Sequence, residues 1–125
     1  HEDIKATHGM LGTTFGGNHL ACTAVLAVLE VLEKEQLVEN AERLGKYFKK
    51  RALEIPQVRE IKGRGLMLGL KFDFEVGELR KNLIYEQHLF TGGAKDKNVL
   101  RILPALNITK SDMDLFFEKL KIALS

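Results

Sequence analysis

A nearly unbroken apolar run is the feature that most constrains the fold of this chain. Between Leu20 and Leu32, in "LACTAVLAVLEVL", only Thr23 and Glu30 are polar. A helix over this run is apolar on almost every side, so it needs cover on more than one face. A two-layer domain offers a helix only one face to bury. The run therefore predicts a partner surface, which could belong to another domain or to a second subunit.

Length, charge and cysteine content exclude several classes of protein. A chain of 125 residues fits one domain with a real core. Its 19 basic and 17 acidic residues leave a net charge of +2, too small and too dispersed to favour a nucleic-acid or membrane partner. The apolar run is shorter than the roughly 20 residues that a bilayer needs. The single cysteine, Cys22, allows no disulfide framework, so we expect a reducing compartment, the cytoplasm.

The rest of the chain alternates helices and strands. We expect helices over residues 38–53 and 78–87, and a last helix that Thr109 and Asp112 cap. Strands are expected near Val58, Leu66, Leu89 and Val99. In the second strand, a large apolar residue occurs at every second position. This period predicts one core face made of Leu66, Leu68, Leu70 and Phe72. The expected fold class is a small α/β domain.

The stretch "GTTFGGN", residues 12–18, opens directly into the apolar helix. Glycines allow close backbone approach, hydroxyls donate hydrogen bonds and a helix N-terminus favours an anion, so the stretch suits a phosphate. It equally suits a plain helix start with Asn18 as the N-cap. Neither a P-loop nor a dinucleotide fingerprint is present.

Arg101, in "NVLRILPAL", is the second candidate. In a strand it shares a face with Val99 and Leu103, where a permanent charge is costly unless a carboxylate or phosphate meets it. The alternatives are an internal ion pair or an edge-strand arginine that reaches solvent. In "FTGGAKDKN", Thr91–Gly93 could line a pocket, but we expect these residues to form a hairpin turn.

A metal centre is not expected. The four histidines have no metal-ligand spacing and the one cysteine has no partner. No serine, histidine and acid arrangement for nucleophilic catalysis can be assembled either.

Three blocks of the sequence carry a resemblance to a known family. In chain order they are "LGTTFGGNHLACTAVLAVLEVLEKEQLVENAERLGKYF", "VREIKGRGLMLGLKF" and "VLRILPALNITKSDMDLFFEKL". Together they resemble the C-terminal part of class III aminotransferases, which use pyridoxal 5′-phosphate on the fold-type I scaffold. "EQHLFTGG" is most similar to the acetylornithine and succinylornithine aminotransferases. The resemblance implies an α+β small C-terminal domain over residues 18–125, a mostly antiparallel sheet covered by helices, after an interface segment over residues 1–17.

The resemblance also implies roles for individual residues. Thr14, with Thr13 beside it, would bind the cofactor phosphate of the opposite subunit, and Arg101 would bind the α-carboxylate of the substrate. A homodimer would form through the segment around Thr14 and the helix from Leu20 to Leu32. Two departures are Leu11, where the family commonly has histidine, and His19, where it commonly has proline.

The implied reaction moves the terminal amino group of N-acetylornithine or N-succinylornithine to 2-oxoglutarate in arginine biosynthesis. Ornithine, 4-aminobutyrate or another ω-amine is the alternative substrate, and a non-catalytic α/β interaction module is the alternative class. The lysine that holds the cofactor, the aspartate beside its ring nitrogen and the stacking aromatic would lie in a large domain that these residues do not include. The resemblance thus implies a C-terminal fragment with no catalytic residue, inactive alone.

Overall fold

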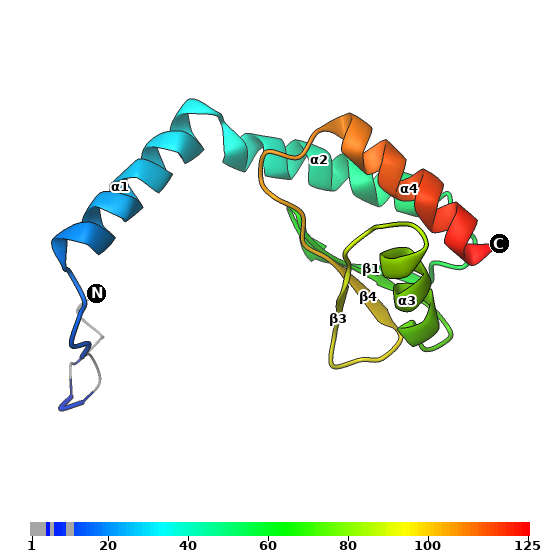
Figure 1. Ribbon diagram of the computed structural model, residues 1–125, viewed down its shortest axis with the longest axis horizontal. Helices are drawn as coiled ribbons and strands as arrows, with labels where there is room; N and C mark the ends of the chain where they lie inside the picture. Colours follow the sequence, from blue (N-terminus) through cyan, green and yellow to red (C-terminus); the bar gives the residue numbers. More distant parts are fainter. Residues whose placement is uncertain (1–4, 6, 10–11) are drawn as a thin grey trace.

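The computed structural model describes residues 5, 7–9 and 12–125 (Figure 1). Over these residues helices and short strands alternate, as the sequence predicts. In chain order they are α1 (His19–Lys34), α2 (Leu37–Ala52), β1 (Glu60–Arg64), β2 (Met67–Lys71), α3 (Gly77–Tyr85), β3 (Gly92–Gly93), β4 (Val99–Ile102) and α4 (Lys110–Leu124).

The strands form one antiparallel sheet in the order β1-β2-β4-β3. β1 and β2 join through a tight turn at Gly65 and Leu66. Their pairing requires glycine at Gly63 in β1, where φ is +102° and a Cβ atom would lie 1.9 Å from the backbone oxygen of Met67. The predicted core face is confirmed, although Gly69 on the other face is buried as well. The four members of the core face are at most 4% exposed: Leu66, Leu68, Leu70 and Phe72. One face of the sheet is therefore core.

Three helices cover that face. Figure 1 shows α2, α3 and α4 on the same side of the sheet. Phe48 of α2 packs against Phe116 and Phe117 of α4, with ring centroids 5.5 and 4.8 Å apart. α4 begins at the expected capping box, in which the side chains of Thr109 and Asp112 each accept from the backbone N–H of the other. None of the described helices covers the opposite face of the sheet.

α1 lies outside this core. It contains no buried residue, and Leu20 and Leu26 are 81% and 67% exposed. Figure 1 shows the helix running away from the sheet, with its C-terminal end next to α2. Its N-cap is Asn18, whose side chain accepts from the backbone N–H of Ala21. None of the helices in the described part of the chain has the length and hydropathy of a membrane-spanning segment.

The region after α3 differs from the sequence prediction. Leu89 is not in a strand, because its backbone N–H donates to the oxygen of Leu83 at 2.7 Å and closes the end of α3. Thr91–Gly93 is not a turn: Gly92 and Gly93 form β3. The turn lies further on, where Asp96 accepts the backbone N–H of Asn98 through its side chain and that of Val99 through its backbone oxygen, both at 3.0 Å.

Leu79 and Leu83 of α3 are buried in the core, whereas Ile84 is only half-buried.

Candidate functional site

Arg101 lies on the open face of the sheet. Its neighbours in β4, Leu100 and Ile102, belong to the core, so Arg101 points to the face that the helices leave uncovered. Of the two apolar residues expected on its face, Val99 is buried and Leu103 is 54% exposed, but Arg101 itself is exposed, so its charge is not removed from solvent as expected. β4 is also an internal strand rather than an edge. Arg101 reaches solvent because helices cover only one face.

Glycines flank Arg101 on both neighbouring strands. Its cross-strand partners are Gly69 in β2 and Gly92 in β3. A Cβ atom at Gly92 would lie 2.8 Å from Nε and 3.2 Å from Nη2 of Arg101, so the guanidinium group lies over the glycine backbone. A Cβ atom at Gly69 would lie 2.9 Å from Cγ1 of Val99. The space beside Gly69 is thus taken by Val99, whereas the missing side chain at Gly92 leaves room for the guanidinium group.

Arg101 has no acidic partner in the part of the chain that the structure describes. The ion pairs there involve other basic residues, such as Lys71 with Asp96 at 3.2 Å beside the same sheet. A guanidinium group presents a planar fork of N–H donors that matches a carboxylate. Arg101 therefore has the chemistry and the access to bind a carboxylate from outside the chain.

A second arginine contacts β3 from the other face of the sheet. Nη2 of Arg80, in α3, donates to the backbone oxygen of Thr91 at 3.3 Å, and a Cβ atom at Gly93 would lie 3.2 Å from its Nη1. Sequence reasoning missed this arrangement. The turn signal of Asp96 and Asn98 could have revealed it, since a hairpin centred there places Gly92 opposite Arg101.

The hairpin turn is held electrostatically at Asp96. The backbone N–H of Asn98 and then the ammonium group of Lys71 hold the pKa of the Asp96 carboxyl below its usual value. Since Lys71 belongs to β2, this contact ties the β3–β4 turn to the neighbouring strand. The position of β3 beside Arg101 is therefore supported from outside the hairpin.

Thr13 and Thr14 lie in an exposed loop before α1. The loop is closed by Asn18, whose Nδ2 donates to the backbone oxygen of Phe15 at 2.6 Å. The side chain of Thr13 lies over Gly16, where a Cβ atom would come within 2.1 Å of Cγ2. Among the described residues the hydroxyl of Thr14 has no hydrogen-bond partner, so it is free to donate to a phosphate oxygen. Leu11 and residues 1–4 and 6 lie outside the described residues.

The structure does not bring Thr14 and Arg101 together. Figure 1 shows the segment before α1 at one end of the molecule and the sheet toward the other, with α1 between them. The two candidate anion contacts are thus separate within one chain, and the hydroxyls of Thr13 and Thr14 would supply only part of a phosphate site.

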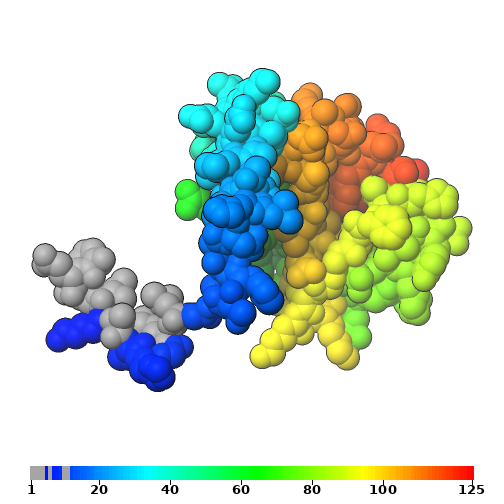
Figure 2. All heavy atoms as spheres, turned by 60° about the vertical axis from the view of Figure 1, so that its left-hand side comes forward, coloured from blue at the N-terminus to red at the C-terminus, as the bar shows by residue number. Residues whose placement is uncertain are grey.

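An apolar groove of about 550 Å³ lies between α1 and the segment after β4. Figure 2 shows these two parts of the chain side by side, α1 in blue and the later segment in orange. The lining comes from the C-terminal half of α1, the start of α2 and the later segment: Ala27, Val28, Val31, Leu32, Glu35, Leu37, Leu106 and Asn107. The lining of the groove as a whole is thus largely apolar and open to solvent.

Comparison with known proteins places the chain in a family. Residues 2–124 match the family described as aminotransferase class-III. The chain is 39% identical over 118 residues to an ornithine aminotransferase of Bacillus subtilis. This match covers 93% of the chain and 29% of that enzyme. It is 44% identical over 114 residues to an acetylornithine aminotransferase of Archaeoglobus fulgidus, which covers 88% and 28%. The chain thus spans about three-tenths of the length of these relatives.

The structural comparison agrees with the family match. The crystal structure of the ornithine aminotransferase from Toxoplasma gondii superposes with a TM-score of 0.80 at 30% identity and covers 95% of this chain and 30% of that chain. A second crystal structure of the same enzyme holds PLP, pyridoxal phosphate, at partial occupancy in its active site. The chain therefore belongs to the class III aminotransferases, whose cofactor is pyridoxal 5′-phosphate.

Proposed function

We propose that this chain forms the C-terminal part of an enzyme that transfers the terminal amino group of N-acetylornithine or N-succinylornithine to 2-oxoglutarate in arginine biosynthesis. The match to class III aminotransferases along residues 2–124 carries the proposal. The 44% identity to an acetylornithine aminotransferase supports the acylated substrate. Ornithine is the second candidate, supported by the Bacillus subtilis and Toxoplasma gondii relatives.

Arg101 is the proposed binding group for the α-carboxylate of both substrates. Amino donor and 2-oxoglutarate each carry this carboxylate, so one guanidinium group serves both halves of the reaction. Its exposure, its glycine neighbours and its lack of an acidic partner among the described residues support this role. The fork of donors fixes the carboxylate plane and therefore orients the rest of the substrate.

Thr14, with Thr13 beside it, is the proposed contact for the cofactor phosphate. A neutral hydroxyl donates one charge-assisted hydrogen bond to a phosphate oxygen. The unpartnered hydroxyl in an exposed loop before a capped helix supports this role. When bound, pyridoxal phosphate supplies the electron withdrawal on which transamination depends. In the complete enzyme, the lysine that holds it would come from outside these residues.

The proposal includes a homodimer. Residues 1–17 would be its interface and phosphate-contact segment, and residues 18–125 its small domain. The separation of Thr14 from Arg101 within one chain supports an arrangement in which Thr14 serves the site of the opposite subunit. The exposed apolar sides of α1 support its burial against that subunit and a large domain. Cys22, exposed and unpaired within the described residues, suits the reducing cytoplasm.

The test is substrate use by the complete protein that carries this chain. Glutamate formation from 2-oxoglutarate is measured with N-acetylornithine, N-succinylornithine, ornithine and 4-aminobutyrate as donors. The proposal expects the highest kcat/KM with an N-acylornithine; a preference for ornithine supports the second candidate instead. Retention of pyridoxal phosphate without transfer from any donor contradicts both. The 125-residue chain alone should show neither bound cofactor absorbance nor transfer, whereas stoichiometric cofactor binding at one of its own lysines would overturn the assignment as a partial enzyme.

A further inference from the structure

We propose that Gly92 is a positioning residue: its missing side chain provides the space in which the Arg101 guanidinium group lies, and so sets where Arg101 binds a carboxylate. The carboxylate part of this inference rests on the proposed function. The positioning part rests on the geometry of β3 and β4 alone.

The backbone does not require glycine at residue 92. Positive φ values occur at Gly9, Gly17, Gly63 and Gly65 among the described glycines, and Gly92 is not one of them. An alanine could therefore adopt the same backbone conformation. What excludes a side chain is Arg101, whose Nε, Nη2 and Cβ would lie 2.8, 3.2 and 3.4 Å from a Cβ atom at this position.

A side chain at residue 92 would clash with the flexible end of the Arg101 side chain. We therefore expect the Arg101 side chain to move while the β3 backbone stays in place. An exposed arginine reaches other rotamers at low cost, whereas separating β3 from β4 would break their hydrogen bonds. Substitution at Gly92 should thus leave the fold intact and displace the guanidinium group.

β3 is held in place from its other face. Arg80 donates to the backbone oxygen of Thr91 and lies against Gly93, while the turn at Asp96 is tied to β2 through Lys71. These contacts hold the Gly92 backbone in its position beside the Arg101 side chain. The two glycines of β3 therefore separate two arginines, each of which contacts only one of them.

This separation supplies a matched pair of variants. Gly92→Ala adds a methyl group against Arg101, and Gly93→Ala adds the same group, one residue along, against Arg80. The Nε–Hε resonances of both arginines are followed in ¹⁵N-labelled 125-residue chain and assigned by their loss in Arg101→Lys and Arg80→Lys. We expect Gly92→Ala to shift the Arg101 resonance and leave that of Arg80 in place, with the reverse result in Gly93→Ala.

Two results of this experiment would overturn the positioning part. One is an unchanged Arg101 resonance in Gly92→Ala. The other is loss of the dispersed backbone amide spectrum in Gly92→Ala, because the strand rather than the side chain would then have given way.

The carboxylate part is tested in the complete enzyme. Gly92→Ala should raise the KM for amino donor and for 2-oxoglutarate together by about tenfold, the scale of one charge-assisted hydrogen bond, with the cofactor absorbance unchanged. Gly93→Ala is the control and should leave both KM values near those of the unsubstituted enzyme. Normal KM values in Gly92→Ala, alongside raised ones in Arg101→Lys, would overturn the inference while the proposed function stands. Normal KM values in Arg101→Lys as well would overturn the proposed role of Arg101.

Discussion

The side-chain amide of Asn40 is hydrogen-bonded to the backbone of Leu106, 66 residues further along the chain, with Nδ2 2.8 Å from the oxygen. Nδ2 also donates to the backbone oxygen of Ile108 at 3.1 Å, and Oδ1 accepts from Nη2 of Arg43 at 2.7 Å. One amide in α2 therefore holds the connection between β4, which carries Arg101, and α4.

The first prediction concerns this amide. Asn40→Asp keeps the shape and the acceptor for Arg43 but replaces the donor by an oxygen that faces two backbone oxygens. We expect the free energy of unfolding to fall by about 1–3 kcal/mol, the cost of leaving such groups unpaired. Asn40→Ala should lower the free energy of unfolding by less, because water can reach the exposed backbone oxygen of Leu106. Urea unfolding measures both. Asn40→Asp as stable as the unsubstituted chain would show that the amide does not hold this connection.

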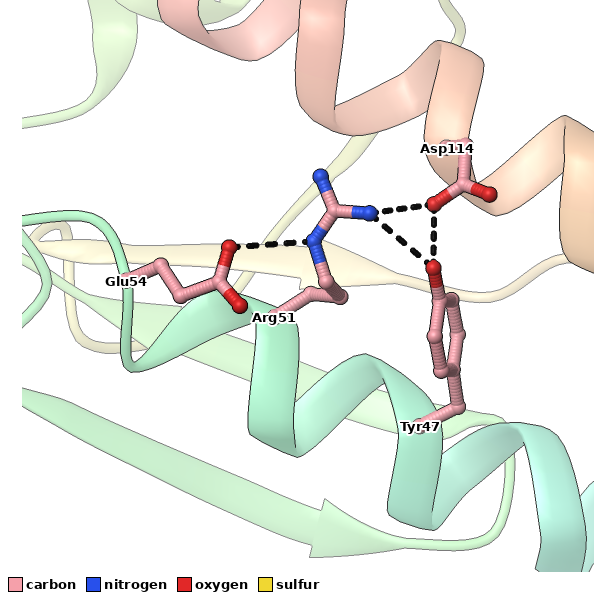
Figure 3. A network of polar contacts seen from close by, with 4 residues as sticks. All are labelled: Tyr47, Arg51, Glu54 and Asp114. Atoms are coloured by element: carbon pink, nitrogen blue, oxygen red, sulfur yellow. Dashed lines mark hydrogen bonds and ion pairs between the residues drawn. The ribbon is translucent and has the colours of Figure 1, made fainter.

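The second prediction concerns the contact between α2 and α4 in Figure 3. Arg51 forms an ion pair with Asp114, Nη1 of Arg51 donates to the hydroxyl of Tyr47 at 2.9 Å, and that hydroxyl donates to the same carboxylate. Because these side chains are only partly exposed, we expect a double-mutant cycle of Arg51→Ala and Asp114→Ala to give a coupling energy of about 1 kcal/mol. The coupling should weaken at high salt. If the stability losses of the two single variants simply add in the double variant, the ion pair contributes nothing to stability.

The third prediction concerns pH and the capping box of α4. The hydroxyl of Thr109, and then its backbone N–H, lower the pKa of the Asp112 carboxyl below its unfolded value. The charged carboxylate thus stabilises the folded state above that unfolded pKa, near pH 4, and the contribution is lost as the pH falls through the lower folded pKa. Asp112→Asn should destabilise the chain at pH 7, and the difference should shrink as the pH falls below the unfolded pKa of Asp, near 4. A stability difference that is independent of pH would contradict this.

Thr109→Ala removes the hydroxyl from the same box. It should cost about 1 kcal/mol at pH 7 in urea unfolding, the usual contribution of an N-cap side chain. Ser111→Ala is the control. The Ser111 hydroxyl hydrogen-bonds to the Thr109 side chain only and takes part in neither backbone hydrogen bond of the capping box.

Local patterns were sufficient for most of the fold. The alternation from Leu66 to Phe72 and the capping residues Asn18 and Thr109 depend on neighbours within four residues, so the sequence alone predicts them. β3 depends on partners far along the chain. A glycine pair has no strand preference of its own, and only pairing with β4 and contact with Arg80 make it a strand.

The candidate site also has features that the sequence predicts and features that depend on distant parts of the chain. The chemistry of Arg101 is evident from its residue type, but its exposure depends on which face of the sheet the helices cover. The resemblance implies ligand-binding roles for both Thr14 and Arg101, yet α1 lies between their segments in this chain. No periodicity carries that information, because it arises from how whole elements are arranged.

The fourth prediction concerns the apolar sides of α1. With Leu20 and Leu26 largely exposed, the 125-residue chain should self-associate in sedimentation experiments as its concentration rises. Leu26→Lys should shift this equilibrium towards monomer. Leu53→Lys is the matched control, since Leu53 is 77% exposed but lies outside α1. A chain that stays monomeric at high concentration, or equal effects of the two variants, would contradict the role of α1.

The last prediction concerns which subunit Thr14 serves in the complete enzyme. Thr14→Ala should weaken cofactor retention by about 1.5–3 kcal/mol, the range of one hydrogen bond to a charged group. Hybrid dimers, isolated with two affinity tags, combine one subunit without the cofactor-binding lysine and one subunit with Thr14→Ala. If Thr14 acts across the dimer, the one site with a lysine receives the intact threonine of the other subunit. Its cofactor retention should then equal that of a control hybrid without the Thr14 substitution, whereas retention as poor as in the Thr14→Ala homodimer would place Thr14 in the site of its own subunit.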